Sequence, residues 1–262
     1  MKRTTFLLSL ALPALAARAV RTTIRSARVA NAPPAATTFK LLYTPLIPRI
    51  ANNILRGRYR DRHDLDKGRF TRTDVARILA RAWRYYDIFA PVARVEQLET
   101  LGSIHNRLGG VLIHALYRAL LDEGLPPDYA TELASDMLWV VYDKMSSFPL
   151  AIARLLARDP QEQVNTTLRL FLRFPFNPPG YEATAVAGTD VFTLDIYRCP
   201  VYDYFHAQGE EAFMLNTFCK TDFALAQVMT QGGSYERPHT LAAGDNVCDM
   251  RWYARPRQLQ PR

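Results

Sequence analysis

The chain has few of the residues that mark common classes of active site. Among its 262 residues there are three cysteines and five histidines, and no HExxH, Walker, dinucleotide-binding or Gly-x-Ser-x-Gly motif occurs. The lack of these motifs argues against the usual metalloprotease, nucleotide-binding and serine-hydrolase classes. The cysteines are separated by 19 and then 28 residues, which fits no zinc-finger, CxxC or haem-attachment spacing.

The amino-terminal segment also lacks a hydrophobic run long enough to span a bilayer, since residues 6–17 give only about 12 apolar positions. Two bases precede this run and small residues follow it, as in a secretory signal peptide. The next segment is rich in Arg, Ser and Thr and has no acids, as in a mitochondrial presequence. We expect residues 1–37 to be a leader and linker. A secretory or signal-anchor segment, a mitochondrial one and a disordered one all stay open, and without targeting the location would be cytoplasmic.

Negative charge is nearly missing from the first 62 residues, which hold twelve Lys or Arg and one acid. The remaining 200 residues hold 21 bases and 24 acids, so the net charge of +8 belongs to the amino-terminal part. Binding to duplex nucleic acid requires cations on the folded surface. We therefore expect no nucleic-acid partner, and the sequence predicts no particular oligomeric state.

The middle of the chain has the apolar periodicity of helices. Apolar residues recur at helical spacing from Val75 to Tyr86, after a possible cap at Thr73-Asp74. We expect this helix to end or bend at Pro91 and others to follow over about 92–122 and 128–146. A break at Phe148-Pro149 precedes a short helix to 158 and another from Asp159 to Pro175. Residues 38–176 are thus predicted to be a helical region.

From Tyr181 onward the period changes to two, which is typical of strands. Residues 177–256 are predicted to be an α+β part of the same domain, and 257–262 a tail. The fold class is therefore α+β, a helical region followed by a small antiparallel sheet with inserted helices. In the first long strand the alternation separates an apolar face from a more polar one, which we interpret as the wall of a site; the polar face carries Thr193, Asp195, Tyr197 and Cys199.

Two later elements place acids near thiols or beside an arginine. A helix expected over 210–229 puts Cys219 and Asp222 on one stripe. In the last expected strand Cys248 shares a face with Met250 and Trp252, whereas Asp249 and Arg251 share the opposite face. The first face favours core packing. The second could bind an anionic group through the planar guanidinium, or could be a surface ion pair.

Three blocks around the cysteines carry a resemblance to a known family. They read CPVYDYFHAQG, FCKTDFALAQ and RPHTLAAGDNVCDMRW. In this order they resemble the carboxyl-terminal signature of the L-2-amino-thiazoline-4-carboxylic acid hydrolase family, strongly over about 195–253 and in pattern over 65–175. Met250 stands where that signature has an aromatic residue.

The resemblance implies hydrolysis of a five-membered ring containing a C=N bond, or a related ring-opening or ring-closing reaction of specialised metabolism. The expected partner is a small molecule, with an anionic group as one option, and no cofactor or metal is expected. Either Cys219 attacks as a thiolate, or a carboxylate activates water. We favour the carboxylate, because an adjacent acid raises the pKa of a thiol. The candidate catalytic residues are Cys219, Asp222, Asp249 and His239, and the candidate substrate-binding residues are Arg251, Cys199, Tyr197 and Cys248.

Two other functions stay open at this point. The Gly-x-x-x-Cys-Asp ending is also similar to small sensor domains of the vinyl-reductase type, which would make the protein a non-catalytic ligand-binding module. A cysteine-ligated metal protein is the other alternative, with Cys199, Cys219, Cys248 and either Asp222 or His239 as ligands.

Overall fold

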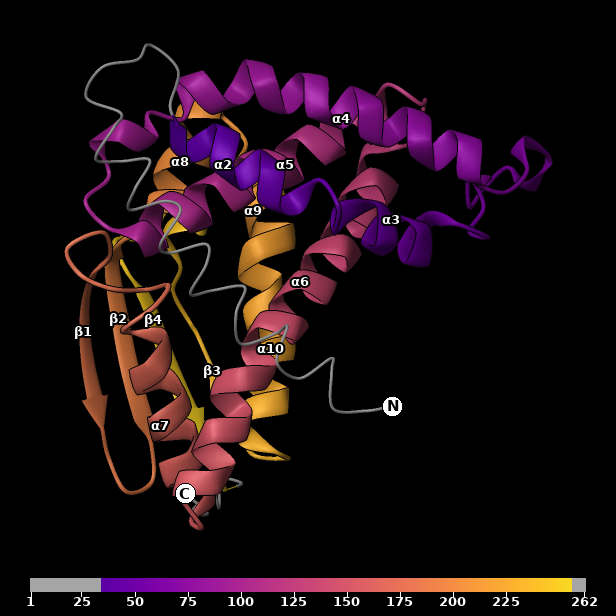
Figure 1. The fold of residues 1–262 in the computed structure, drawn as a ribbon. Coiled ribbons are helices and arrows are strands. Elements are labelled where there is room, and N and C mark those ends of the chain that lie inside the picture. Colours follow the sequence, from indigo (N-terminus) through magenta and orange to yellow (C-terminus); the bar gives the residue numbers. More distant parts are fainter. Residues whose placement is uncertain (1–33, 256–262) are drawn as a thin grey trace.

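The computed structural model describes residues 34–255, so residues 1–33 of the expected leader and linker, and the expected tail, lie outside the described residues. Its helices are arranged as an arm above and beside a small sheet (Figure 1). No helix in this described range has the length and apolar character needed to cross a bilayer. The combination of many helices with one antiparallel sheet confirms the α+β prediction.

The helical part begins earlier than the sequence predicted. Helix α2 (Pro34–Tyr43) begins within the segment expected to be a linker, and helix α3 (Ile47–Leu55) follows it in the expected helical region. Proline is well tolerated in the first turn of a helix, where its missing N–H would have no intrahelical partner. Both helices bury apolar residues against the rest of the helical core, including Phe39 and Leu55.

Helix α4 (Arg72–Val92) packs along α5 (Leu101–Leu121), which is buried on nearly every side. The cap of α4 is Thr71, not the expected Thr73. Its hydroxyl accepts from the backbone N–H of Asp74, and the Asp74 carboxylate accepts from the Thr71 N–H in return. The expected helix over 92–122 starts late because Arg94 takes a left-handed conformation, φ 47°, after α4. Thr100 then caps α5.

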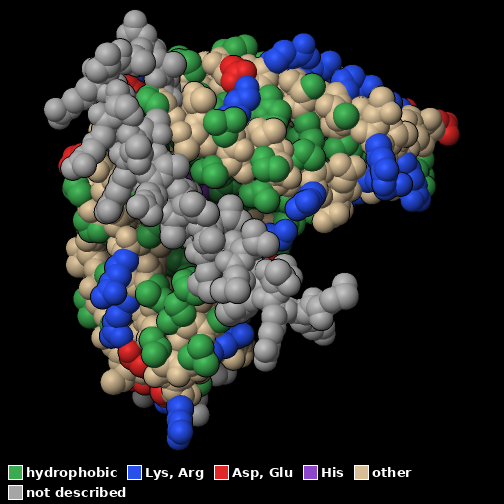
Figure 2. Space-filling view, in the orientation of Figure 1, with side chains coloured by type: hydrophobic (Ala, Val, Ile, Leu, Met, Phe, Trp, Pro, Cys, Tyr) green, Lys and Arg blue, Asp and Glu red, His purple; other side chains and the backbone are tan. Residues whose placement is uncertain are grey.

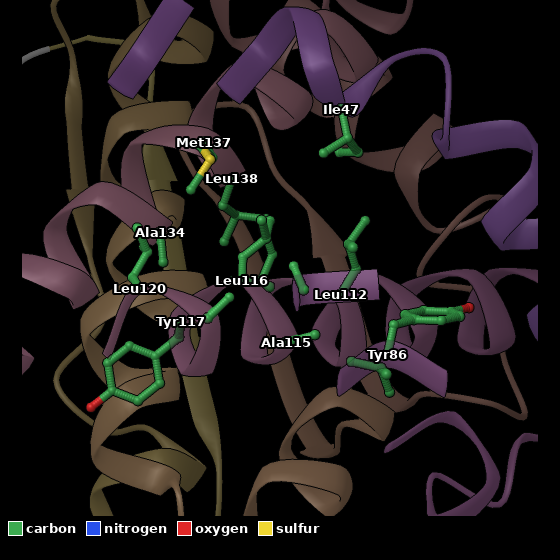
Figure 3. Close-up of a cluster of buried hydrophobic side chains, with 14 of the residues drawn as sticks. Ile47, Tyr86, Leu112, Ala115, Leu116, Tyr117, Leu120, Ala134, Met137 and Leu138 are labelled. Carbon is green, nitrogen blue, oxygen red and sulfur yellow. The ribbon is translucent and has the colours of Figure 1, made fainter. Parts of the chain in front are cut away.

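Helix α6 (Pro127–Leu156) runs through the predicted break at Pro149 without interruption. Leu150 and Ala153 beyond this proline are buried, and this apolar contact holds the helix together where local propensity disfavours it. Helix α7 (Pro160–Phe171) starts at the Asp159 cap, as predicted. Side chains from α3 to α6 meet in one apolar cluster, in which Ile47, Tyr86, Leu112, Leu116 and Met137 contribute (Figure 3).

Many Lys and Arg side chains lie along the outer edge of the arm formed by α3 and α4 (Figure 2). Several of them are paired with acids. Arg77 donates to both Asp74 and Glu123, and Arg81 also lies within 3.2 Å of Glu123. Part of this positive charge is therefore neutralised by acids of the helical part, Asp74 and Glu123.

The sheet has the order β1-β2-β4-β3 and is antiparallel throughout. Its strands are β1 (Glu182–Ala187), β2 (Phe192–Arg198), β3 (Ser234–Glu236) and β4 (Cys248–Tyr253). Between β2 and β3 the chain forms α8 (Pro200–Gln208), α9 (Glu211–Met214), a π-helical turn (Leu215–Cys219) and α10 (Lys220–Thr230). The predicted helix over 210–229 is thus one helical segment with a π turn inside it.

The two faces of the sheet have different surroundings. Phe192, Leu194, Ile196, Met250 and Trp252 are buried on one face. They join a second apolar cluster with residues of α7 and α10, the helices that lie over this face (Figure 1). The side chains between them on β2 and β4 are more exposed, so the alternation read from the sequence is confirmed.

Candidate functional site

A cavity lies where the two apolar clusters meet. It is enclosed by the buried face of the sheet, by α6 and α7, by the start of α8 and by the π turn and α10. The space open to the centre of a water-sized sphere is about 90 Å³, whereas one buried water needs roughly 10–15 Å³. The cavity can therefore admit a molecule of several non-hydrogen atoms. Its lining residues that bear a hydroxyl, a thiol or a charge are Tyr142, Tyr181, Cys199, Tyr202, Cys219, Asp222, Arg237, Thr240 and Cys248.

All three cysteines reach this cavity, each from a different element. Cys199 directly precedes α8, Cys219 ends the π turn and Cys248 begins β4. The Thr240 hydroxyl lies 3.3 Å from the Cys248 sulfur and 4.0 Å from that of Cys219. The Leu241 N–H also donates to Cys248, at 3.3 Å. The three thiols are free and form no disulfide.

The start of α8 is held in place from the central helix α5. Gly110 allows close packing here, because an added Cβ would lie 3.3 Å from the Phe205 ring. The buried Arg107 donates from Nε to the Pro200 carbonyl at 2.8 Å and from Nη2 to Asp203 at 3.2 Å. These contacts fix the turn in which Cys199 leaves the strand and enters the cavity wall.

Burial keeps the thiols in their protonated form. It raises the pKa of Cys219 to about 12, with a further contribution from the negative charge of Asp222. Burial also raises the pKa of Cys199 and Cys248. A thiol attacks as its thiolate, so the raised pKa disfavours nucleophilic attack by each of the three.

Asp222 is the carboxylate that lines the cavity, and its partner is Arg237. The Arg237 Nη1 donates to Asp222 Oδ2 at 2.7 Å. Burial raises the pKa of Asp222 to about 6, although the Arg237 charge opposes the increase. A carboxyl group that titrates near neutral pH can both accept and return a proton.

Arg237 was missed in the sequence, although it stands in the block RPHTLAAGDNVCDMRW. Only 5 % of its side chain is exposed, and its guanidinium lies 4.9 Å from the centre of the Phe223 ring. A signal was present, since an arginine directly after a strand can reach a neighbouring helix. The sequence did not show that the helix within reach of Arg237 would be the one that carries Asp222.

The other predicted site residues lie outside the cavity lining. Arg251 donates to Asp195 on the neighbouring strand at 2.6 Å, and Asp249 accepts from the backbone and ring nitrogens of His239 at 2.8 and 2.9 Å. His239 and Tyr197 are exposed. The hydrogen bond and charge of Asp249 raise the pKa of His239, which is a surface interaction.

Apart from Cys199, the polar face of β2 that we interpreted as the wall of a site does not line this cavity. The cavity lies on the apolar face, with Leu194 and Ile196, and Tyr197 points away from it. Cys199 reaches the cavity because the strand ends at Arg198 and the chain turns there. Cys248 lines the cavity from the face of β4 that it shares with Met250 and Trp252, which the sequence predicted to pack in the core.

The metal alternative is not supported by side-chain placement. Within residues 34–255, no three His, Cys, Asp or Glu side chains gather closely enough to hold a metal ion. His239, one of the suggested ligands, lies on the side of the sheet where it pairs with Asp249. The three cysteines line one cavity but do not form a ligand cluster.

Comparison with known protein families identifies the chain. The model of the L-2-amino-thiazoline-4-carboxylic acid hydrolase family matches residues 106–252, so the chain belongs to this family. The match runs from α5 to β4 and includes every residue that lines the cavity. The family description names a hydrolase. No curated protein and no solved structure gave a significant match.

Proposed function

We propose that the protein is a hydrolase that opens a small cyclic, amidine-like ring, such as a thiazoline, in this cavity, with Asp222 as the proton-transferring group. The observation that carries the proposal is Asp222 itself, a carboxylate whose pKa is raised to about 6 in an otherwise largely apolar cavity. The family description, which names a thiazoline carboxylic acid, supports this substrate class.

The reaction adds one water molecule to the ring. Asp222 takes a proton from water, and the hydroxyl adds to the ring carbon that is doubly bonded to nitrogen, while that nitrogen gains a proton. The tetrahedral carbon then expels a ring heteroatom and becomes a carbonyl. The heteroatom leaves with the remaining proton, so the product is the open-chain carbamoyl compound.

In this scheme the thiols form part of the cavity wall and do not attack the substrate. Burial and the Asp222 charge both oppose the thiolate form of Cys219. Cys248 is further engaged by the Thr240 hydroxyl and the Leu241 N–H. A weakly polar, polarisable wall suits a sulfur-containing ring.

The test is to incubate the purified full chain with L-2-amino-thiazoline-4-carboxylate and with related cyclic amidines. Mass spectrometry should show conversion to a product heavier by one water molecule, with turnover that scales with protein concentration. If the compounds bind but are not converted, the ligand-binding alternative is correct. If none binds or reacts, the proposed substrate class is wrong.

A further inference from the structure

We infer that Arg237 is the anion-binding residue of this cavity, and that an anionic ligand competes with the Asp222 carboxylate for its guanidinium. The inference rests on the proposed function for the identity of the cavity as the substrate site. It assigns the anionic group of the substrate to a residue other than Arg251, the arginine that the sequence favoured.

The hydrogen-bonding capacity of Arg237 is only partly used. A guanidinium has five N–H donors in a planar fork. Within residues 34–255, the Arg237 side chain donates a hydrogen bond to Asp222, and its buried Nε has no hydrogen-bond partner. The hydroxyl of Tyr235, two residues earlier on β3, is likewise buried without a partner. A buried donor without an acceptor destabilises the site, and a bound carboxylate would remove that cost.

The positive charge inside the cavity comes from Arg237. Arg237 is the only Lys, Arg or His among the described residues that line it. Its guanidinium is largely removed from bulk water and lies over Phe223. In such surroundings a bidentate arginine–carboxylate contact is strong and directional. An anionic ring substituent placed there would orient the ring toward Asp222.

Several buried titratable groups face Asp222. They come from α6 (Tyr142), from the segment before β1 (Tyr181), from β3 (Tyr235), from the π turn (Cys219) and from β4 (Cys248). Burial raises the pKa of every one of these groups, so all stay neutral between about pH 5 and 8. Within this set, Asp222 alone changes its charge in that range, and Arg237 balances it.

The competition therefore has a defined dependence on pH. Above about pH 6 the ionised Asp222 occupies part of the Arg237 fork. Below it Asp222 becomes neutral and leaves the guanidinium to the ligand. The affinity for an anion should rise as the pH falls through the Asp222 pKa, and an uncharged ligand of the same shape should show no such change.

The experiment uses two non-hydrolysable five-membered sulfur heterocycles, thiophene-2-carboxylate and thiophene-2-carboxamide, with calorimetric titration into the full chain. Neither probe changes charge between about pH 5 and 8. The wild type should bind the carboxylate at least about tenfold more tightly than the carboxamide, and the difference should grow toward low pH. Equal affinities for the two probes across this range, or no binding of either, would overturn the inference.

Three variants sharpen the assignment. Arg237→Gln should remove the preference for the carboxylate, and Arg237→Lys should keep only part of it because the fork is lost. Asp222→Asn should tighten carboxylate binding severalfold above about pH 7 and abolish its pH dependence. Arg251→Gln, which removes the Asp195-paired arginine on the outer face of the sheet, should change neither the preference nor its pH dependence. Loss of the preference in Arg251→Gln but not in the Arg237 variants would place the anion on the outer face.

This test is independent of turnover. If the carboxylate preference is found but no cyclic amidine is hydrolysed, the anion subsite stands and the proposed reaction fails. If hydrolysis is found without the carboxylate preference, the proposed reaction stands and the anion subsite at Arg237 fails. Two of the measurements, the wild-type pH dependence and the binding to Asp222→Asn, leave Arg237 in place. They can therefore contradict the inference even if the Arg237 variants do not fold.

Discussion

The two faces of the small sheet each have an Asp–Arg pair with almost the same contact distance, and only one pair belongs to a cavity. Arg237 contacts Asp222 at 2.7 Å, and Arg251 contacts Asp195 at 2.6 Å. The exposed fractions of the two aspartates are similar, 31 % and 27 %, but those of the arginines are 5 % and 28 %. The two pairs therefore differ in the burial of the arginine, and only the Arg237–Asp222 pair has apolar surroundings.

This difference has a chemical consequence. An exposed ion pair contributes little to stability, because water and salt screen the two charges. In the cavity, loss of hydration outweighs the attraction of Arg237, so the pKa of Asp222 rises despite the adjacent positive charge. The pair on the buried face is thus suited to proton transfer, and the outer pair joins two neighbouring strands.

The largest expected effect is the loss of activity in Asp222→Asn. Removing the group that transfers the proton should lower kcat by about 10²–10⁴-fold. Steady-state kinetics with a thiazoline substrate and a thermal melt of the same preparation would measure it. The matched control is Asp195→Asn on the outer face, which should retain nearly full activity. Equal losses in both variants would contradict the distinction between the faces.

A large effect on stability is expected on the buried face of β4. Trp252 is 5 % exposed and packs against Phe192 and Tyr235. Its replacement by alanine should lower the free energy of unfolding by about 3–5 kcal/mol. Urea unfolding followed by circular dichroism is the measurement. A change below about 1 kcal/mol would mean that this face is not packed as described.

The pH dependence of turnover should reveal the raised pKa of Asp222. Since the ionised carboxylate accepts the proton of water, kcat/KM should fall by about tenfold per pH unit below about pH 6. A substrate carboxylate on Arg237 adds a second negative charge and raises the Asp222 pKa further in the complex. The fall in kcat should therefore begin at a higher pH than the fall in kcat/KM. A flat profile down to about pH 4, near the ordinary range of an aspartate, would rule out this role.

A smaller effect is expected when the thiols are replaced. Because the pKa of Cys219 is raised to about 12, Cys219→Ala should keep kcat within about tenfold of the wild type. The same holds for Cys199→Ala and Cys248→Ala. Kinetics and iodoacetamide sensitivity would be compared across the three variants. A loss as large as that of Asp222→Asn in one of them would identify a nucleophilic thiol.

The smallest effect is expected for Arg251→Gln. Both partners of the outer pair are partly exposed, so solvent screening limits its contribution to less than about 1 kcal/mol. Chemical denaturation at low and at high salt would measure the difference from the wild type. A loss of several kcal/mol that persists at high salt would show that the outer pair is also a buried, strongly coupled feature.

Much of the fold was predictable because it depends on local periodicity. The helices over 72–92 and 160–171 and the alternation of β2 follow from spacing and from nearby caps. The predictions that failed concern positions where distant contacts override local preference. Pro149 stays within α6, and Pro34 begins a helix where a linker was expected.

For the site, the sequence determined which residues could do chemistry and which of them share a face. The stripe of Cys219 and Asp222, the opposition of Cys248 to Asp249 and the family blocks were all readable from the chain. Only the tertiary structure decided which face of the sheet encloses a cavity, because that depends on where α7 and α10 pack. The same packing removed Arg237 from water beside Asp222 and left Arg251 at the surface, and desolvation is a property of the whole fold that no local pattern encodes.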